Sequence, residues 1–219
     1  MRFESNKTME KPIIIFGAKG IAYPALEIFN SNNVVVFGFL EEDEKLHGTE
    51  INTVTVLGNT EDEGFLKLIG QKAEAFVAVD DTKYRKFLVE MLQENRKVQP
   101  VNAIHQTAYI STDATIGHGN FINAKVNIGT AATIGSHCIL HSGAIIDHNA
   151  KLGDFVQVGA GSIINAEVTI EDGAFIGSGV TIISGVTIGK NSRVGAGSVV
   201  ISTVSNGETV FGNPAAKVK

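Results

Sequence analysis

The chain has 219 residues, of which 43% are hydrophobic and 19% charged, which leaves room for one large or two modest globular domains. The net charge of −5 provides no basic stripe for a phosphate backbone and argues against a general nucleic-acid binder. No apolar run approaches a membrane span, the first residues are too polar for a signal peptide, and the single cysteine, Cys138, excludes an intramolecular disulfide, so a cytoplasmic setting is expected.

The first hundred residues alternate between strand and helix patterns. A polar tail is expected over residues 1–11, and a small Rossmann-like parallel α/β domain over residues 12–100. Its expected helices cover residues 23–30, 64–69 and 82–95, and a short extended segment covers residues 54–57. Its expected strands cover residues 12–16, 34–40, 74–79 and 98–101.

A glycine-containing turn follows the first expected strand. Gly17-Ala18-Lys19-Gly20 does not match the dinucleotide fingerprint G-x-G-x-x-G, so a nicotinamide cofactor is disfavoured. Its small residues still let a ligand approach the backbone, and the helix that follows attracts phosphate. At the end of the second strand, Glu41 or Glu42 is placed to accept a hydrogen bond from a ribose or base, although a solvated acidic loop is the alternative.

From residue 104 onward the sequence repeats every six residues. Seventeen successive positions at this spacing, from Ile104 to Val200, are all Ile, Leu or Val, and eight of them precede a glycine. The residue four places later is small or Val in every case except Asn120. This period predicts an all-β solenoid over residues 101–205, in which three hexads complete one triangular turn of eighteen residues, followed by a C-terminal tail over residues 206–219.

Histidines are the polar residues of the solenoid that suggest chemistry. His105 and His141 are two whole turns apart, but a third metal ligand is missing because Ile146 occupies its place, so no metal is expected. The alternative is one histidine acting as a base: His148 has Ala166 one turn further on, and a column of small residues (Ala160, Ser178 and Ala196) is expected alongside. A solvated surface histidine is the simpler interpretation of His148.

Several motifs together carry a family resemblance that covers residues 12–217. They are the Gly-Ala-x-Gly turn, Phe39-Leu40-Glu41-Glu42, the repeats with Ile146-Asp147-His148 and Leu152-Gly153-Asp154-Phe155, and the terminal 211–217 segment, FGNPAAK. In this combination the chain resembles sugar acetyltransferases with hexapeptide repeats, of the sialic acid O-acetyltransferase and bacillosamine N-acetyltransferase type. The resemblance implies a left-handed parallel β-helix, a homotrimer, and acetyl-CoA as co-substrate lying between adjacent solenoids.

The resemblance also implies roles for individual residues. His148 would be the general base, with Asn149 beside it. The nucleotide-linked sugar would contact Gly17, Gly20, Glu41 and Glu42, and acetyl-CoA would contact Gln157, Ala166, Ser178, Ala196 and Lys217. The sequence departs from the family pattern at three places: Asn149 replaces an acid, Gln157 replaces a histidine, and Ile21 replaces the histidine of the first turn.

These departures bear on the acceptor. An amine is already nucleophilic and tolerates a weakened base, whereas a hydroxyl needs strong base assistance. We therefore expect an N-acetyltransferase acting on a nucleotide-linked amino sugar for surface glycan biosynthesis. The alternatives are a sialic-acid-type O-acetyltransferase and a non-catalytic nucleotide-sugar or acyl-CoA binding protein; acetyl-CoA turnover, as distinct from binding, separates the enzymes from the binding protein.

Overall fold

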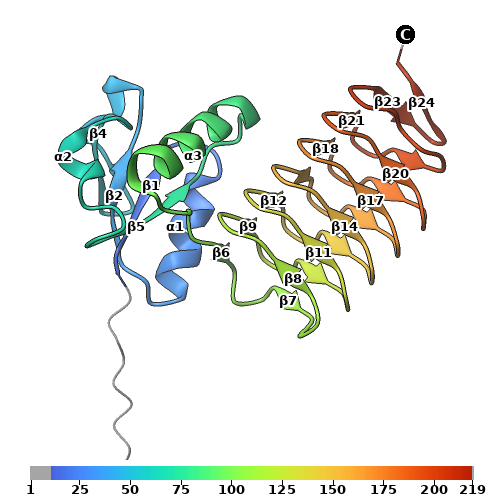
Figure 1. Cartoon of the computed structure of the whole chain (residues 1–219), viewed down its shortest axis with the longest axis horizontal. Helices are drawn as coiled ribbons and strands as arrows, with labels where there is room; N and C mark the ends of the chain where they lie inside the picture. Colours follow the sequence, from blue (N-terminus) through green and yellow to red (C-terminus); the bar gives the residue numbers. More distant parts are fainter. Residues whose placement is uncertain (1–10, 219) are drawn as a thin grey trace, which may run out of the picture.

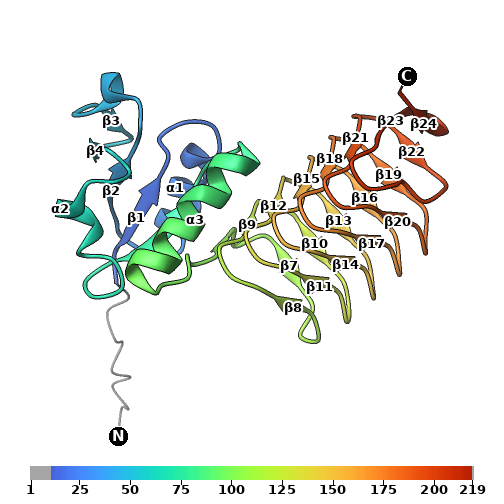
Figure 2. The ribbon, with the colours of Figure 1, turned by 45° about the horizontal axis from the view of Figure 1, so that its top comes forward.

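The structure is a computed structural model that describes residues 11–218, so the expected tail lies outside the described residues except for Lys11. An α/β unit lies at one end, and a coil of very short strands extends away from it to the C-terminus (Figure 1). Residues 97–102 connect helix α3 (Thr82–Arg96) to the first turn of the coil, which extends away from the α/β unit (Figure 2).

The α/β unit is a five-stranded sheet in the order β3-β4-β2-β1-β5, with β3 antiparallel and the others parallel. Ile13 and Ile15 of β1 face the cluster that contains α1, whereas Ile14 and Phe16 face α3. A strand buried on both sides explains the continuous apolar run. The elements are β1 (Ile13–Phe16), α1 (Ala22–Ser31), β2 (Val36–Leu40), the 3₁₀ helix η1 (Glu44–Leu46), β3 (Glu50–Ile51), β4 (Val54–Gly58), α2 (Glu63–Leu66), β5 (Glu74–Val77) and α3 (Thr82–Arg96).

Helix α3 begins and ends where its sequence requires. The carboxylate of Asp81 accepts the backbone N–H of Tyr84 at 2.7 Å, and Lys97 ends the helix in the left-handed conformation. The prediction of a strand over residues 98–101 is wrong. That segment makes a single sheet-like bond, from Val101 N to Ala75 O at 2.9 Å, because Pro100 has no N–H to continue a ladder.

The coil has three faces that the chain visits in turn. We name one face after the α/β unit that packs against it, and the other two after their outward residues. The docked face is β6 (Ala103–Ile104), β9 (Phe121–Ile122), β12 (Ile139–Leu140), β15 (Gln157–Val158), β18 (Phe175–Ile176), β21 (Arg193–Val194), β23 (Thr209–Gly212) and β24 (Ala215–Lys217). The apolar face is β7 (Tyr109–Ile110), β10 (Asn127–Ile128), β13 (Ile145–Ile146), β16 (Ile163–Ile164), β19 (Thr181–Ile182) and β22 (Val199–Val200). The threonine face is β8 (Thr115–Ile116), β11 (Thr133–Ile134), β14 (Lys151–Leu152), β17 (Thr169–Ile170) and β20 (Thr187–Ile188).

The predicted period sets the register of every coil. Ile128 pairs with Ile110 on one side and Ile146 on the other, at the expected spacing of eighteen residues. The second residue of each strand points inward, and these aliphatic residues form one continuous buried column. At each corner one residue has a positive φ, as shown by the column Gly119, His137, Phe155, Gly173 and Asn191.

The first residue of each strand points outward, and it differs between the faces. On the docked face, Phe121 and Ile139 are each 1% exposed because they share a buried cluster with α1. On the apolar face, Ile145 and Ile163 are 39% and 37% exposed. Tyr109 on the same face is 62% exposed, so this face carries apolar side chains that residues 11–218 do not cover.

Candidate active site

The turn after β1 lies against the end of β5. Gly17 has φ +100°, and a Cβ there would lie 2.6 Å from the Ala78 carbonyl oxygen. Gly20 has φ +54°, and a Cβ there would lie 2.1 Å from Oδ2 of Asp80. Both glycines are therefore needed for the turn itself, which lies at the carboxyl edge of the sheet where α/β proteins bind ligands.

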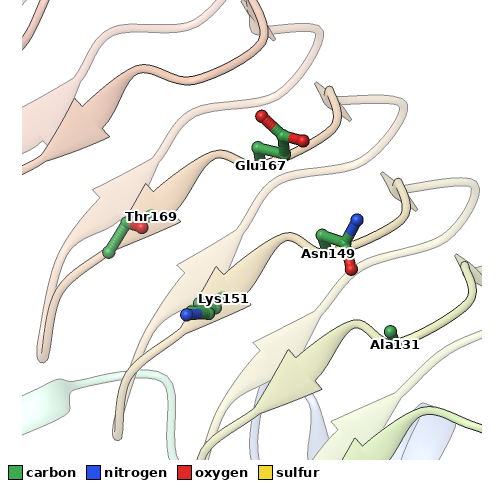
Figure 3. A pocket seen from close by; sticks show the side chains of 5 residues that line it. All are labelled: Ala131, Asn149, Lys151, Glu167 and Thr169. Carbon is green, nitrogen blue, oxygen red and sulfur yellow. The ribbon is translucent and has the colours of Figure 1, made fainter.

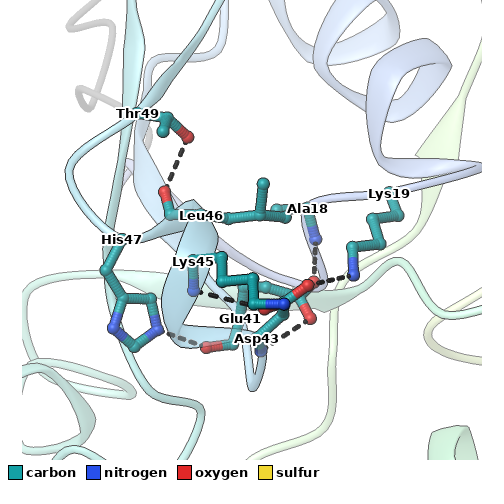
Figure 4. Close-up of polar contacts among 8 residues, drawn as sticks. All are labelled: Ala18, Lys19, Glu41, Asp43, Lys45, Leu46, His47 and Thr49. Atoms are coloured by element: carbon teal, nitrogen blue, oxygen red, sulfur yellow. Dashed lines mark hydrogen bonds and ion pairs between the residues drawn. The ribbon is translucent and has the colours of Figure 1, made fainter.

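Glu41 ties this turn to the end of β2 (Figure 4). Its Oε2 accepts the backbone N–H of Ala18 at 2.8 Å, and its Oε1 accepts that of Asp43 at 3.2 Å. The Asp43 carboxylate in turn accepts Nζ of Lys19 at 2.8 Å, and this bond lowers the pKa of Asp43 and raises that of Lys19. Glu41 is thus engaged within the chain, on both oxygens.

Glu42 is exposed and differs from its neighbour. It lies close enough to Tyr84 to help raise the pKa of that phenol, although burial is the main cause of the shift. The Tyr84 hydroxyl is also 3.1 Å from Oγ1 of Thr60, beyond the end of β4. Of the two predicted acids, Glu42 is therefore the one whose oxygens remain open to a ligand.

A cleft of about 780 Å³ separates the start of α3 from the docked face. Arg193 covers the ring of Phe175 at 4.4 Å on its coil side. Sequence reasoning missed both residues, although an outward aromatic and a cation one turn apart are a usable signal. The cleft is lined by Asp80, Asp81, Thr82, Lys83, Lys86, Gln157, Gly173, Phe175, Asn191 and Arg193.

Gln157 is held by His141 on this face. The side-chain nitrogen of Gln157 lies 3.2 Å from Nε2 of His141, and since an amide nitrogen only donates, the imidazole accepts. Burial lowers the pKa of His141, although the nearby Asp80 carboxylate acts the other way. A neutral His141 therefore fixes the Gln157 amide, which keeps a second N–H for a ligand.

His148 lies at the corner between the apolar and threonine faces, and its side chain is 55% exposed. Oδ1 of Asp147 is 3.1 Å from His148 Nδ1 and also accepts the His148 backbone N–H at 2.7 Å. Asn149 adopts φ +58° and contributes to a shallow groove with Ala131, Lys151, Glu167 and Thr169 (Figure 3). The carboxylate beside the imidazole is thus Asp147.

The predicted acetyl-CoA residues fall into separate groups. Ala166 lies one turn after His148 at the same corner, as expected. Ser178 and Ala196 lie not alongside His148 but at the next corner, between the docked and apolar faces, because the strands of the apolar face intervene. Lys217 ends β24, where it pairs with Glu208 at 3.5 Å.

The structure therefore brings together the Gly17–Gly20 turn, Glu42, Asp80 and Gln157, but not His148. The corner that carries His148 is opposite the docked face in a three-sided coil. Within residues 11–218 there is no cluster of three or more histidine, cysteine or acidic residues placed to hold a metal. No helix of that part of the chain is long and apolar enough to cross a membrane.

Comparisons with known proteins agree with this architecture. The family model described as "Bacterial transferase hexapeptide (six repeats)" matches residues 167–202. A variant of the GDP-perosamine N-acetyltransferase from Caulobacter crescentus, solved with CoA and GDP-perosamine, is 30% identical with a TM-score of 0.87, over 95% of this chain and 97% of that chain. WeeI from Acinetobacter baumannii is 26% identical with a TM-score of 0.81, over 94% and 99% of the two chains. No curated protein sequence matches significantly.

A third structure supports the fold alone. The acetyltransferase domain of PglB from Neisseria gonorrhoeae, solved with acetyl coenzyme A, has a TM-score of 0.87 at 24% identity over 95% of this chain and the whole of that chain. Fold and repeats define an acyltransferase with a left-handed parallel β-helix, which confirms the predicted fold class. The chain belongs to the hexapeptide-repeat sugar acetyltransferases, the family that its motifs resemble.

Proposed function

We propose that this chain transfers the acetyl group of acetyl-CoA to the amine of a nucleotide-linked amino sugar, as a step in surface glycan biosynthesis. The observation that carries the proposal is the cleft of about 780 Å³ in which the ligand-binding edge of the α/β sheet meets Gln157 of the coil. The relative from Caulobacter crescentus, whose structure contains CoA and GDP-perosamine, supports a pair of substrates of this kind.

The nucleotide sugar binds the α/β domain, residues 12–100. Helix α1 has no side-chain cap at its N-terminus, but the Ala22 N–H already donates to the Lys19 carbonyl at 3.0 Å and Pro24 has no N–H. In this first turn the Tyr23 amide is therefore the donor left for a diphosphate that approaches over Gly17 and Gly20. Glu42 accepts a hydrogen bond from the ribose or the base. Glu41 contributes indirectly, because it fixes the turn that the diphosphate approaches.

Acetyl-CoA lies along the coil between neighbouring subunits. The backbone N–H groups of Ala166, Ser178 and Ala196 donate no hydrogen bond within residues 11–218, which leaves them for the carbonyls of a pantetheine arm. Lys217, on the hairpin of the C-terminal tail (residues 206–219), supplies a cation for a phosphate group. Gln157 donates to the thioester carbonyl, on which negative charge develops during attack.

His148 is the base of this site, and it comes from a second copy of the chain. Its corner is opposite its own cleft, so a neighbouring coil must bring His148 to that cleft. A homotrimer packed through the apolar faces provides this arrangement and covers Ile145 and Ile163. Nε2 of His148 removes a proton as the sugar nitrogen bonds to the acetyl carbon, and the carbon–sulfur bond breaks to release CoA.

The test is release of free thiol from acetyl-CoA across a panel of nucleotide-linked amino sugars, with His148→Ala assayed in parallel. We expect turnover on one amino sugar and a loss of about 100- to 10,000-fold in the variant, the usual contribution of a positioned base. Turnover that survives His148→Ala would contradict the base assignment. Binding without turnover on the whole panel would favour the non-catalytic alternative.

A competition assay tests the choice of acceptor. An equimolar pair of sugars that differ only by an amino or hydroxyl group at the acceptor position is offered with acetyl-CoA. We expect acetylation of the amine, because a neutral amine needs less base assistance than a hydroxyl. Acetylation of the hydroxyl sugar alone would establish an O-acetyltransferase instead.

A further inference from the structure

A carboxylate lies beside the base of the proposed site, but not at the position where the family resemblance implies it. Oδ1 of Asp147 accepts the His148 backbone N–H at 2.7 Å and lies 3.1 Å from Nδ1 of the same residue. The bond from the His148 backbone lowers the pKa of Asp147, so this carboxylate is charged at neutral pH. Two contacts between the same residues hold the imidazole in one orientation.

Position 149 is not suited to this role because it forms the corner of the coil. Asn149 shares its positive φ with Ala131, Glu167 and Gly185 at the same corner of neighbouring turns. Its side chain lines the groove with Lys151 and Glu167 (Figure 3), and it makes no hydrogen bond to His148 within the described chain. Asparagine tolerates the left-handed conformation better than most residues, which accounts for Asn149 on backbone grounds alone.

We propose that Asp147 is the positioning residue of the base, in place of an acid at position 149; this inference rests on the proposed function. With Nδ1–H donating to Asp147, Nε2 is the unprotonated nitrogen that faces outward. Nε2 takes the proton of the sugar amine as the carbon–nitrogen bond forms, and it returns a proton to the departing thiolate. The carboxylate stabilises the imidazolium between these two steps.

Two substitutions separate orientation from charge. Asp147→Asn keeps an oxygen that can accept both N–H groups but removes the charge, whereas Asp147→Ala removes both. We expect kcat/KM to fall about tenfold in the first and about a hundredfold in the second, less than when the base itself is lost. The KM for each substrate should stay unchanged in both variants, so the whole loss should fall on kcat.

Two control variants accompany the series. Asp172→Asn changes another corner carboxylate, which accepts the Asp154 N–H at 3.0 Å, pairs with Lys190 at 3.3 Å and has no histidine partner within residues 11–218, and it should leave kcat/KM unchanged. Asn149→Asp should change kcat/KM by less than about threefold, because Asn149 makes no hydrogen bond to His148 within residues 11–218 and Asp147 already holds the ring. Lys151 and Glu167, the other charged residues lining the groove beside this corner, stay constant throughout the series.

The outcomes distinguish this inference from the proposed function. Full activity in Asp147→Ala would overturn it, as would rescue of Asp147→Ala by Asn149→Asp. If the wild type acetylates no amino sugar, the proposed function fails, and the nitrogen chemical shifts of the His148 ring, which report its tautomer, test the contact directly. Nδ1 should carry the proton in the wild type and lose that preference in Asp147→Ala, and an unchanged tautomer ratio would overturn the inference.

Discussion

The docked and apolar faces of the coil share one pattern but differ in their surroundings. Both place bulky side chains at the outward position of their strands, yet Phe121 on the docked face is 1% exposed and Ile163 on the apolar face is 37% exposed. The α/β domain covers the first turns of the docked face, and no part of residues 11–218 covers the apolar face. An outward apolar residue on a solenoid suggests a covering neighbour, which for the docked face is the α/β domain and for the apolar face is the second subunit proposed above.

The same contrast, between a covered and an exposed side chain, separates two histidines of the coil. His137 is 4% exposed, lies against the ring of Phe155 at 4.9 Å, and has its pKa lowered to about 4 by burial. His148, eleven residues later, is open to solvent and paired with Asp147. Residue type alone does not separate a packing histidine from a chemical one, because the surroundings decide which ring can exchange protons.

The largest expected effect comes from charging the apolar face. Ile145→Lys with Ile163→Lys should convert the proposed trimer into monomers without unfolding the chain, since both side chains already face outward. Activity should fall about 100- to 10,000-fold, because separation removes the partner's base from the cleft. Sedimentation velocity and thiol release measure the two consequences.

A matched pair on the threonine face is the control for this experiment. Thr115→Lys with Thr133→Lys adds the same charge at equivalent outward positions. This variant should keep the oligomeric state and the activity of the wild type. If the apolar-face variant also keeps the wild-type mass, the assignment of that face as the subunit interface is wrong.

The next effect concerns the docked face. Phe121→Ala should lower the free energy of unfolding by about 3–5 kcal/mol, because a buried ring shared between the coil and α1 is replaced by a cavity. Thr133→Ala, at the equivalent position of the threonine face, should cost less than about 0.5 kcal/mol. Urea denaturation measures both, and similar values for the two variants would contradict the contrast between the faces.

His137 makes stability depend on pH. Its folded pKa of about 4 lies below the ordinary histidine value of 6.5, so the unfolded chain binds a proton first as the pH falls. Stability should therefore be lost between about pH 6.5 and pH 4, by about 3 kcal/mol from this group. His137→Asn, which suits the positive φ of +60° at this position, should flatten that part of the curve of stability against pH.

The coil could be predicted from the sequence because its contacts repeat at a fixed spacing. Each inward residue meets its equivalents eighteen residues away, so one period specifies strands, register and core together. The α/β domain was predicted less accurately, because short segments depend on tertiary contacts. The β3–β4 hairpin was missed because its two-residue turn, Asn52-Thr53, lacks the glycine that usually marks such turns. Both residues nevertheless adopt positive φ in the structure.

The site was harder to predict because it depends on which corner each residue occupies. Ser178 and Ala196 were predicted alongside His148, although their spacing from it is not a whole number of eighteen-residue turns, and they lie one corner away. The contact between Asp147 and the His148 ring could not be predicted from residue spacing, since it follows from the backbone of the corner. The cleft itself pairs Gln157 with Asp80, which are far apart in sequence.

The smallest expected effect on kcat concerns Gln157, the residue through which the docked face is proposed to contribute to the chemistry. Gln157→Leu removes the N–H proposed to meet the thioester carbonyl, and kcat should fall about tenfold. The loss should be no larger because the cleft is open to water, where an oxyanion donor contributes less than in an enclosed site. Gln157→His restores the residue that the family resemblance implies and again offers one N–H donor, so kcat should stay within about threefold of the wild type. A fall in both variants would mean that the bond between Gln157 and His141, at 3.2 Å, matters more than the donor, because a shorter imidazole at position 157 cannot reproduce that contact. An unchanged kcat in both would leave the carbonyl to the backbone amides of the corner, and the docked face would then serve binding alone.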